Sequence, residues 1–353
     1  MGKDNDFRGK AEGWGIQLFV VFLRTESDST ENMKKLLLIL SLLVSASAGA
    51  QERSPLNVKV YPQAQLSWNV GQGQFSGLAY LGNDLYAVVD DKRPGGGIVY
   101  MQLSLANYGQ ARMGIPEATS QSSIAGRDNE GIAFVPATQK LWVSSESDQR
   151  IREYGLDGVE TGRELAVPAE FGVGNITPNM GFEALTFNAA TGRFWTTTEG
   201  PLKGESAHRL QSFTADGAPA DQFLYEADAS TKNGAGAAAY VFGIPALAAL
   251  DDGRVLVLER EVYVPSGGIF DKAFRSFTRM HLYAVDPNGA AAGSLLPKQA
   301  VASWSTSALN LANFEGMCLG PTLSDGSHSL LLIADSQGGS GGLTGEYIKL
   351  ITF

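Results

Sequence analysis

Short segments in which apolar and polar residues alternate recur along this chain at nearly even intervals. Each copy of the pattern has an apolar strand, a turn, and a second strand that ends in a carboxylate. The copies are FSGLAYLGNDLYAVVDD (75–91), EGIAFVPATQKLWVSSE (130–146), EALTFNAATGRFWTTTE (183–199), PALAALDDGRVLVLE (245–259) and EGMCLGPTLSDGSHSLLLIAD (315–335). The period of two, with many β-branched and aromatic residues, predicts strands. Each copy is expected to be one structural unit that buries its apolar faces only against its neighbours.

The spacing of the copies predicts an all-β fold, a β-propeller with four-stranded antiparallel blades. Measured from Ser76, Glu130, Glu183, Pro245 and Glu315, the intervals are 54, 53, 62 and 70 residues, and the two ends of the chain after residue 50 supply about one further interval. Five blades fit this count, and the ring closes if an N-terminal strand (58–61 or 65–70) joins the sheet that holds 347–353. Six blades are the alternative if 201–244 or 260–312 contains a degenerate blade.

Other elements follow from the same pattern. We expect outer strands after the second hairpin at 150–155 and 163–167, joined by an Asp-Gly turn. No segment has a convincing helical period. A β-sandwich is the weaker rival, because sandwiches do not repeat one hairpin at a constant interval.

The N-terminal region has the three parts of a secretory signal peptide. Residues 33–50 contain two lysines, a nine-residue apolar stretch and a small-residue cleavage site that ends at Ala50. The stretch is too short to span a bilayer, which needs ~20 apolar residues. We therefore expect residues 1–32 to be an upstream mis-start or a disordered extension, and 51–353 to be a single propeller domain in the periplasm or outside the cell.

Composition restricts the partners. The formal net charge is −10, and it stays −10 after residues 1–50 are removed, because they hold six basic and six acidic residues. This balance argues against nucleic acid and against anionic membrane surfaces as partners. Cys318 is the only cysteine and there are three scattered histidines, so neither an internal disulfide nor a Cys/His zinc site is expected. We expect a monomer that acts on a small molecule.

Acidic residues occur at equivalent positions of the copies. In a propeller the first strand of each blade lies beside the central channel, and its start lies next to the end of the second strand. One mouth of the channel should therefore collect the acids that open the copies, Glu130, Glu183 and Glu315, and those that end them, Asp90, Glu146, Glu199, Glu259 and Asp335. Two unit charges ~5 Å apart repel by roughly 3 kcal/mol at an effective dielectric of ~20. Such a cluster must take up protons, pair with basic residues or hold metal.

Calcium is the metal that this cluster favours, because calcium binds oxygen ligands in irregular geometry. Asparagines that precede the three opening glutamates, Asn129, Asn179 and Asn313, add amide oxygens. The alternative is a purely structural role, with salt bridges to Arg127, Lys92, Arg260 or Lys203. Copies one and four open with Ser76 and Pro245, and this asymmetry favours a site over a repeating brace.

Several segments resemble the phytase-like propeller family that is described as having esterase-like activity. They are 75–78 (FSGL), 128–133 (DNEGIA), 179–185 (NMGFEAL), 255–260 (VLVLER), 313–317 (NFEGM) and 332–336 (LIADS). The resemblance implies a propeller, an exported location and calcium-assisted hydrolysis of phosphate esters or similar esters.

Roles for single residues follow from this hypothesis. Calcium would be held by Glu130, Glu183 and Glu315, with help from Asp335 or Glu199; the remaining acids of the mouth, Asp90 and Glu259, complete the candidate ligands. Glu146 would act as the base, and Arg260, Lys92 or Arg127 would neutralise phosphate. Two other functions stay open: a non-catalytic propeller that metal stabilises and that binds a ligand or protein, and a lactonase-like hydrolase whose calcium polarises a carbonyl.

Overall fold

The computed structural model describes residues 53–66, 73–91, 97–105, 128–307, 310–336 and 345–353. All of them lie within one compact unit, Glu52–Phe353, which is described here by itself. The residues predicted as an extension and a signal peptide, 1–50, lie outside the described part of the chain. No helix within the described ranges is long and apolar enough to cross a membrane.

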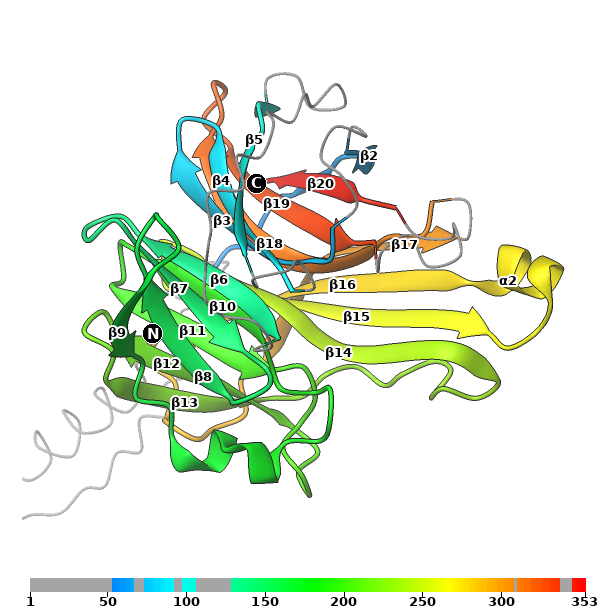
Figure 1. The fold of residues 1–353 in the computed structure, drawn as a ribbon, viewed down its shortest axis with the longest axis horizontal. Coiled ribbons are helices and arrows are strands. Elements are labelled where there is room, and N and C mark those ends of the chain that lie inside the picture. The colour runs from blue at the N-terminus through cyan, green and yellow to red at the C-terminus, as the bar shows by residue number, and fades with distance from the viewer. Residues whose placement is uncertain (1–52, 67–72, 92–96, 106–127, 308–309, 337–344) are drawn as a thin grey trace, which may run out of the picture. The chain divides into compact units, whose positions relative to one another are not determined.

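Five antiparallel sheets follow one another along the chain and form a five-bladed propeller (Figure 1). Blade 1 contains β3 (Phe75–Gly82), β4 (Leu85–Asp90) and β5 (Ile98–Gln102); blade 2 contains β6 (Asn129–Val135), β7 (Lys140–Ser145), β8 (Arg150–Tyr154) and β9 (Glu160–Glu164). Blade 3 contains β10 (Phe182–Asn188), β11 (Arg193–Thr198), β12 (His208–Thr214) and β13 (Pro219–Tyr225). Blade 4 contains β14 (Ala237–Ala249), β15 (Val255–Pro265), β16 (Phe277–Val285) and β17 (Lys298–Ser307).

Blade 5 closes the ring with strands from both ends of the unit. It contains β18 (Asn313–Thr322), β19 (His328–Asp335) and β20 (Tyr347–Thr352), and β20 also pairs with β1 (Lys59–Val60) and β2 (Ala64–Gln65). The predicted closure is confirmed, and both N-terminal segments take part in it. The five-bladed prediction is confirmed as well, since 201–244 and 260–312 contribute outer strands and an elongated fourth blade.

The core is divided into five apolar clusters, and each lies between two consecutive blades. Between blades 2 and 3, for example, the rings of Trp142 and Phe194 meet edge to face with centroids 5.3 Å apart. A cluster between blades 5 and 1 joins Tyr86 to Leu331 and completes the circle. Because no blade buries both of its faces alone, the blades must stabilise one another.

Two local predictions differ from the structure. Strand β9 begins three residues before the predicted 163–167 segment, because Gly158 and Gly162 (φ 75° and 85°) allow an earlier return of the chain. The chain also contains a short helix, α2 (Ile269–Arg275), together with the 3-10 turns η3 (Ala169–Phe171) and η4 (Val173–Asn175). Seven residues are too few for a helical period to stand out from the surrounding strands.

Candidate metal centre

A β-bulge near the start of the inner strand of every blade positions the candidate site. We call Ser76, Glu130, Glu183, Pro245 and Glu315 the opening residues, because they begin the five repeated hairpins. The pairing of each inner strand with its neighbour shifts register at the opening residue, so none of the five has a partner across the hairpin. A bulge leaves its extra residue unpaired and re-aims that side chain. The five opening residues are thereby turned towards the channel.

Glycines let the inner strands approach one another at this level. A Cβ atom on Gly77 would lie 2.3 Å from the Glu130 carbonyl oxygen, and one on Gly131 would lie 2.6 Å from that of Glu183. These distances are far shorter than any Cβ contact allows, so only glycine fits. In the Glu-Gly sequence that opens blade 2, the glycine therefore allows close packing of the inner strands and the glutamate supplies the charge.

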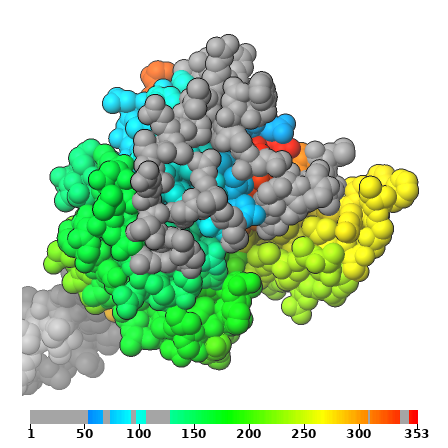
Figure 2. Space-filling view, in the orientation of Figure 1, coloured from blue at the N-terminus to red at the C-terminus, as the bar shows by residue number. Residues whose placement is uncertain are grey.

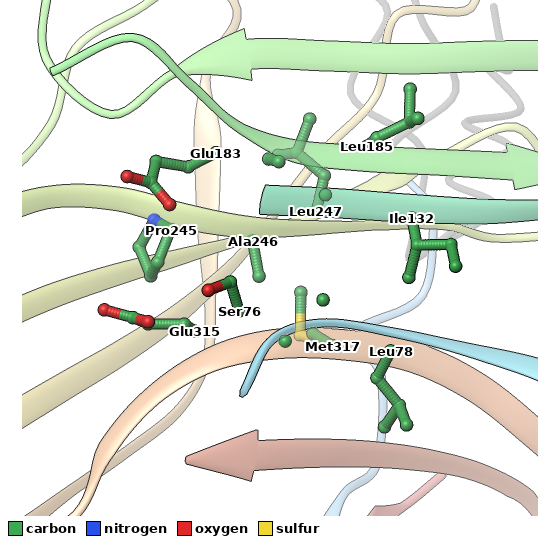
Figure 3. Close-up of a pocket in the computed structure, with 14 residues that line it drawn as sticks. Ser76, Leu78, Ile132, Glu183, Leu185, Pro245, Ala246, Leu247, Glu315 and Met317 are labelled. Atoms are coloured by element: carbon green, nitrogen blue, oxygen red, sulfur yellow. The ribbon is translucent and has the colours of Figure 1, made fainter. Parts of the chain in front are cut away.

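The opening residues, four polar and one proline, form a ring above an apolar one. In Figure 3, Ser76, Glu183, Pro245 and Glu315 lie at one end of the pocket, and the apolar side chains lie at the other end. The apolar ring consists of the residues two positions further along each inner strand, Leu78, Ile132, Leu185, Leu247 and Met317. The cavity between the rings holds about 10 Å³, which is no more than one water molecule needs. A ligand of the acidic opening residues must therefore bind at the mouth, because the cavity below them has no room for it.

The second strands supply five further residues at the mouth, which we call the closing residues. They are the positions that pair with the residue two before each opening residue: Asp91, Glu146, Glu199, Arg260 and Asp335. The sequence prediction is correct in register for Glu146, Glu199 and Asp335. It is wrong by one residue in blade 1, where Asp91 rather than Asp90 closes the hairpin, and in blade 4, where Arg260 rather than Glu259 does so. A slip of one residue moves a strand side chain to the opposite face.

Glu259 therefore lies away from the mouth. Its carboxylate accepts hydrogen bonds from the Tyr225 hydroxyl (2.5 Å), the Asp228 backbone N–H (3.0 Å) and the Lys298 ammonium (2.8 Å). Glu259 is thus excluded from the predicted metal ligands by its own partners. Asp90 is buried and accepts a hydrogen bond from the Gln74 backbone N–H at 3.3 Å.

Arg260 neutralises one half of the mouth. Its guanidinium forms ion pairs with Glu199 of the preceding blade and Glu315 of the following blade, and it donates a further hydrogen bond to Asn313 Oδ1 (2.9 Å). The side chain is buried, and the surrounding carboxylates raise its pKa above the ordinary arginine value against the effect of burial. Arg260 is consequently a structural cation that joins three blades.

The other half of the mouth gathers carboxylates. Oxygens of Glu130, Glu146 and Glu183 all lie within 4.8 Å of one another, and so do those of Asp91, Asp128 and Glu130. The Ser76 hydroxyl donates a hydrogen bond to Glu130, and the Gly181 backbone N–H donates one to Glu146 Oε1 (2.8 Å). Two acidic groups that share Glu130 are therefore available to hold a cation.

Burial and repulsion between carboxylates dominate the electrostatics of this half. Burial raises the pKa of Glu130 well above its ordinary value, and repulsion from Glu315 and Asp91 adds to the effect. Burial, followed by Glu130 and Glu199, raises the pKa of Glu183 in the same way. In the half that contains Arg260, burial raises the pKa of Glu199 to about 7, although Arg260 opposes the shift. Without a cation, part of this cluster must be protonated near neutral pH.

Asp91 and Asp128 are members of the acidic groups that the sequence prediction did not select. Asp91 directly follows Asp90, and only the bulge at Ser76 decides which of the two points to the mouth. Asp128 precedes β6 with a positive φ of 47°, in the Asp-Asn-Glu-Gly segment that carries part of the family resemblance. The position of Asp128 in that segment is the sequence feature that could have identified it as a site residue. Lys92 and Arg127, proposed as phosphate-binding cations, lie outside the described residues.

The raised pKa values predict how stability depends on pH. A carboxyl group whose pKa is higher in the folded than in the unfolded state stabilises the fold fully below its unfolded pKa, here 4.5, and loses that contribution as pH rises through its folded pKa. For Glu199, whose folded pKa is about 7, most of this contribution is lost between pH 4.5 and pH 7. For Glu130 and Glu183 the pKa is also raised, so their contributions are lost in the same direction as pH rises. Between pH 4.5 and pH 7, the melting temperature of chelator-treated wild-type protein should therefore fall by more than the melting temperature of the chelator-treated Glu183→Gln variant. If differential scanning calorimetry gives the same fall in melting temperature for both proteins, the raised pKa of Glu183 is contradicted.

Comparison with known proteins agrees with this architecture. A family model described as "Phytase-like: Esterase-like activity of phytase" matches residues 70–337, about three quarters of the chain. The chain belongs to this phytase-like family. The match includes every opening and closing residue. No curated protein matches the sequence.

Solved structures are similar at low identity. The catalytic domain of a Coprinopsis cinerea GH62 α-L-arabinofuranosidase is 12% identical, with 83% of this chain and 97% of that chain covered and a TM-score of 0.46. A luciferin-regenerating enzyme is 11% identical over 85% and 96% of the two chains, with a TM-score of 0.41. A PQQ-bound aldose sugar dehydrogenase from Streptomyces coelicolor is 16% identical over 84% and 100%, with a TM-score of 0.37. Similarity at this level carries no argument about the reaction.

Proposed function

We propose that this phytase-like propeller is exported and hydrolyses phosphate esters or similar esters with the help of calcium held by Glu130 and Glu183, with Glu146 beside the ion as the base. The observation that carries the proposal is the convergence of these three carboxylates from consecutive hairpins within 4.8 Å. Export is inferred from the leader-like segment 33–50.

The residues present fit a hard divalent cation. Carboxylate oxygens are the ligands that calcium prefers, and oxygens of three carboxylates meet here within 4.8 Å of one another. Within the described part of the chain the Glu183 carboxylate accepts no hydrogen bond, although its residue is only 9% exposed. A buried carboxylate without a donor is costly unless it is protonated or bound to metal.

The chain's own groups then divide the work. Glu130 and Glu183 are buried and serve to hold the ion, whereas Glu146 is partly exposed and lies on the solvent side, where a carboxylate can accept a proton from water. The Gly181 N–H fixes the orientation of Glu146. When bound, calcium would supply a Lewis acid that polarises the ester and lowers the pKa of attacking water. The apolar ring below keeps both substrate and water at the mouth.

One observation favours a second candidate, the hydrolysis of a carboxylic ester or lactone. Arg260 is held by Glu199, Glu315 and Asn313 and is buried, so it is not available to bind phosphate. A neutral carbonyl substrate does not need such a cation.

A substrate panel tests both candidates. We expect purified protein to hydrolyse either p-nitrophenyl phosphate or a p-nitrophenyl ester and lactones in the presence of calcium, and to lose that activity with excess EDTA. Readdition of calcium should restore it, and calcium should also raise the melting temperature. A calcium-dependent melting temperature without any hydrolysis would identify a non-catalytic, metal-stabilised propeller. If calcium and EDTA change neither quantity, the metal proposal fails.

A further inference from the structure

The helix α2 presents its apolar face to solvent. Ile269 and Phe270 are each 78% exposed and Phe274 is 84% exposed, the highest values among the large hydrophobic residues that the structure describes. At 100° per residue these side chains and Ala273 cover one side of the helix, and Asp271, Lys272 and Arg275 cover the other. Asp271 and Lys272, by contrast, are partly buried. The usual arrangement of an amphipathic helix on its own protein is therefore reversed.

The position of α2 sets it apart from the blades. Strands β14 and β15 continue past the pairing of Gly243 with Arg260, as far as the pairing of Ala237 with Pro265, and α2 follows at the tip. Arg260 lies at the mouth, so the extension begins there and leads away from the ring. In Figures 1 and 2 the yellow segment that contains α2 forms the end of a projection from the fourth blade. We call this extension, residues 229–242 and 261–279, the arm.

The arm differs in charge from the rest of the chain. It contains four basic residues, Lys232, Lys272, Arg275 and Arg279, and two acidic ones, Glu261 and Asp271, which gives a net charge of +2 within a chain of −10. Glu261 is buried and accepts hydrogen bonds from the backbone N–H groups of Thr231 and Lys232, and Asp271 is paired with Arg275. Glu261 also forms an ion pair with Arg279 (3.8 Å), so Lys232 and Lys272 are the basic residues of the arm for which the described part of the chain shows no acidic partner.

We propose that the tip of the arm is a docking element for an anionic lipid surface, into which Ile269, Phe270 and Phe274 insert. Exposed aromatic residues on one side of a helix with lysine and arginine beside them are the features of interfacial membrane binding. Anionic lipid headgroups attract basic residues near the surface. A second copy of the chain is less well matched, because two tips of the same positive charge would repel. The net charge of the whole chain argues against an anionic membrane partner, but the arm has the opposite net charge and can bind such a surface.

Vesicle co-sedimentation tests the proposal with the whole chain. Wild-type protein should bind vesicles of phosphatidylglycerol and phosphatidylcholine more strongly than vesicles of phosphatidylcholine alone, and F270S/F274S should bind the anionic vesicles at least about tenfold more weakly. Val159 and Val173 are exposed hydrophobics of blades 2 and 3 (58% and 55%), so V159S/V173S is the matched control and should bind as wild type does. Because all three proteins share the N-terminal segment, its contribution cancels.

Three results would overturn the proposal: no binding to anionic vesicles, equal binding by wild type and F270S/F274S, or an equal loss in the control variant. Light scattering identifies the rival occupant. A wild-type dimer that F270S/F274S converts to a monomer, without vesicle binding by either, would assign the tip to a second copy instead. Circular dichroism and the melting temperature confirm that the surface variants fold.

Discussion

Replacing Arg260 with methionine is expected to lower the free energy of unfolding by about 3–5 kcal/mol, because the change leaves Glu199 and Glu315 buried or partly buried without their cation. Methionine keeps most of the apolar stem, so the loss is due to charge rather than to packing. Guanidinium chloride unfolding, with wild type and variant compared at equal m-value, measures the difference.

The matched control for this change is Arg150→Met. Arg150 pairs with Glu164 on the surface of blade 2, where the two side chains are 58% and 37% exposed, and its loss should cost less than about 1 kcal/mol. The triple variant R260M/E199Q/E315Q should recover part of the stability, since it removes the unpaired charges as well. Equal costs for Arg260→Met and Arg150→Met would show that Arg260 does not join the blades.

Replacing Glu183 with glutamine is expected to weaken calcium binding at least about tenfold and to reduce any calcium-dependent hydrolysis by a similar or larger factor. The substitution keeps size and removes one charge from the group formed with Glu130 and Glu146. Because burial and like charge raise the pKa of Glu183, the variant should be at least as stable as wild type in EDTA.

Isothermal titration calorimetry measures the affinity, and Glu259→Gln is the informative control. Glu259 is an acid of the same repeat pattern, but it is bound to Tyr225 and Lys298 away from the mouth. Its replacement should leave calcium affinity unchanged, although it should lower stability. Wild-type affinity in Glu183→Gln would remove Glu183 from the site.

The repeat pattern was sufficient to predict the architecture. Five hairpins of period two, with intervals near 60 residues, can bury their faces only by stacking in a ring, and the clusters between consecutive blades have this arrangement. The ring closure followed from the count of residues at the two ends. The helix α2 was not predicted, because seven residues are too few to show a helical period and its large apolar residues are exposed rather than buried.

The site was predicted only in part, for reasons of register. The opening glutamates were identified because they recur, but the choice between Asp90 and Asp91, or between Glu259 and Arg260, depends on bulges that have no clear signature in a single sequence. Of the two interpretations of the acidic mouth, salt bridges describe the half in which Arg260 pairs with Glu199 and Glu315. Metal is our proposal for the other half, where the acids gather around Glu130.

The most direct test is a crystal structure of the protein grown in millimolar calcium, with anomalous scattering used to locate the ion. We predict a calcium ion at the mouth with oxygens of Glu130 and Glu183 at about 2.3–2.6 Å and with Arg260 still bound to Glu199 and Glu315. An acidic mouth that contains no ion under these conditions, or a calcium ion bound only elsewhere on the protein, would contradict the account.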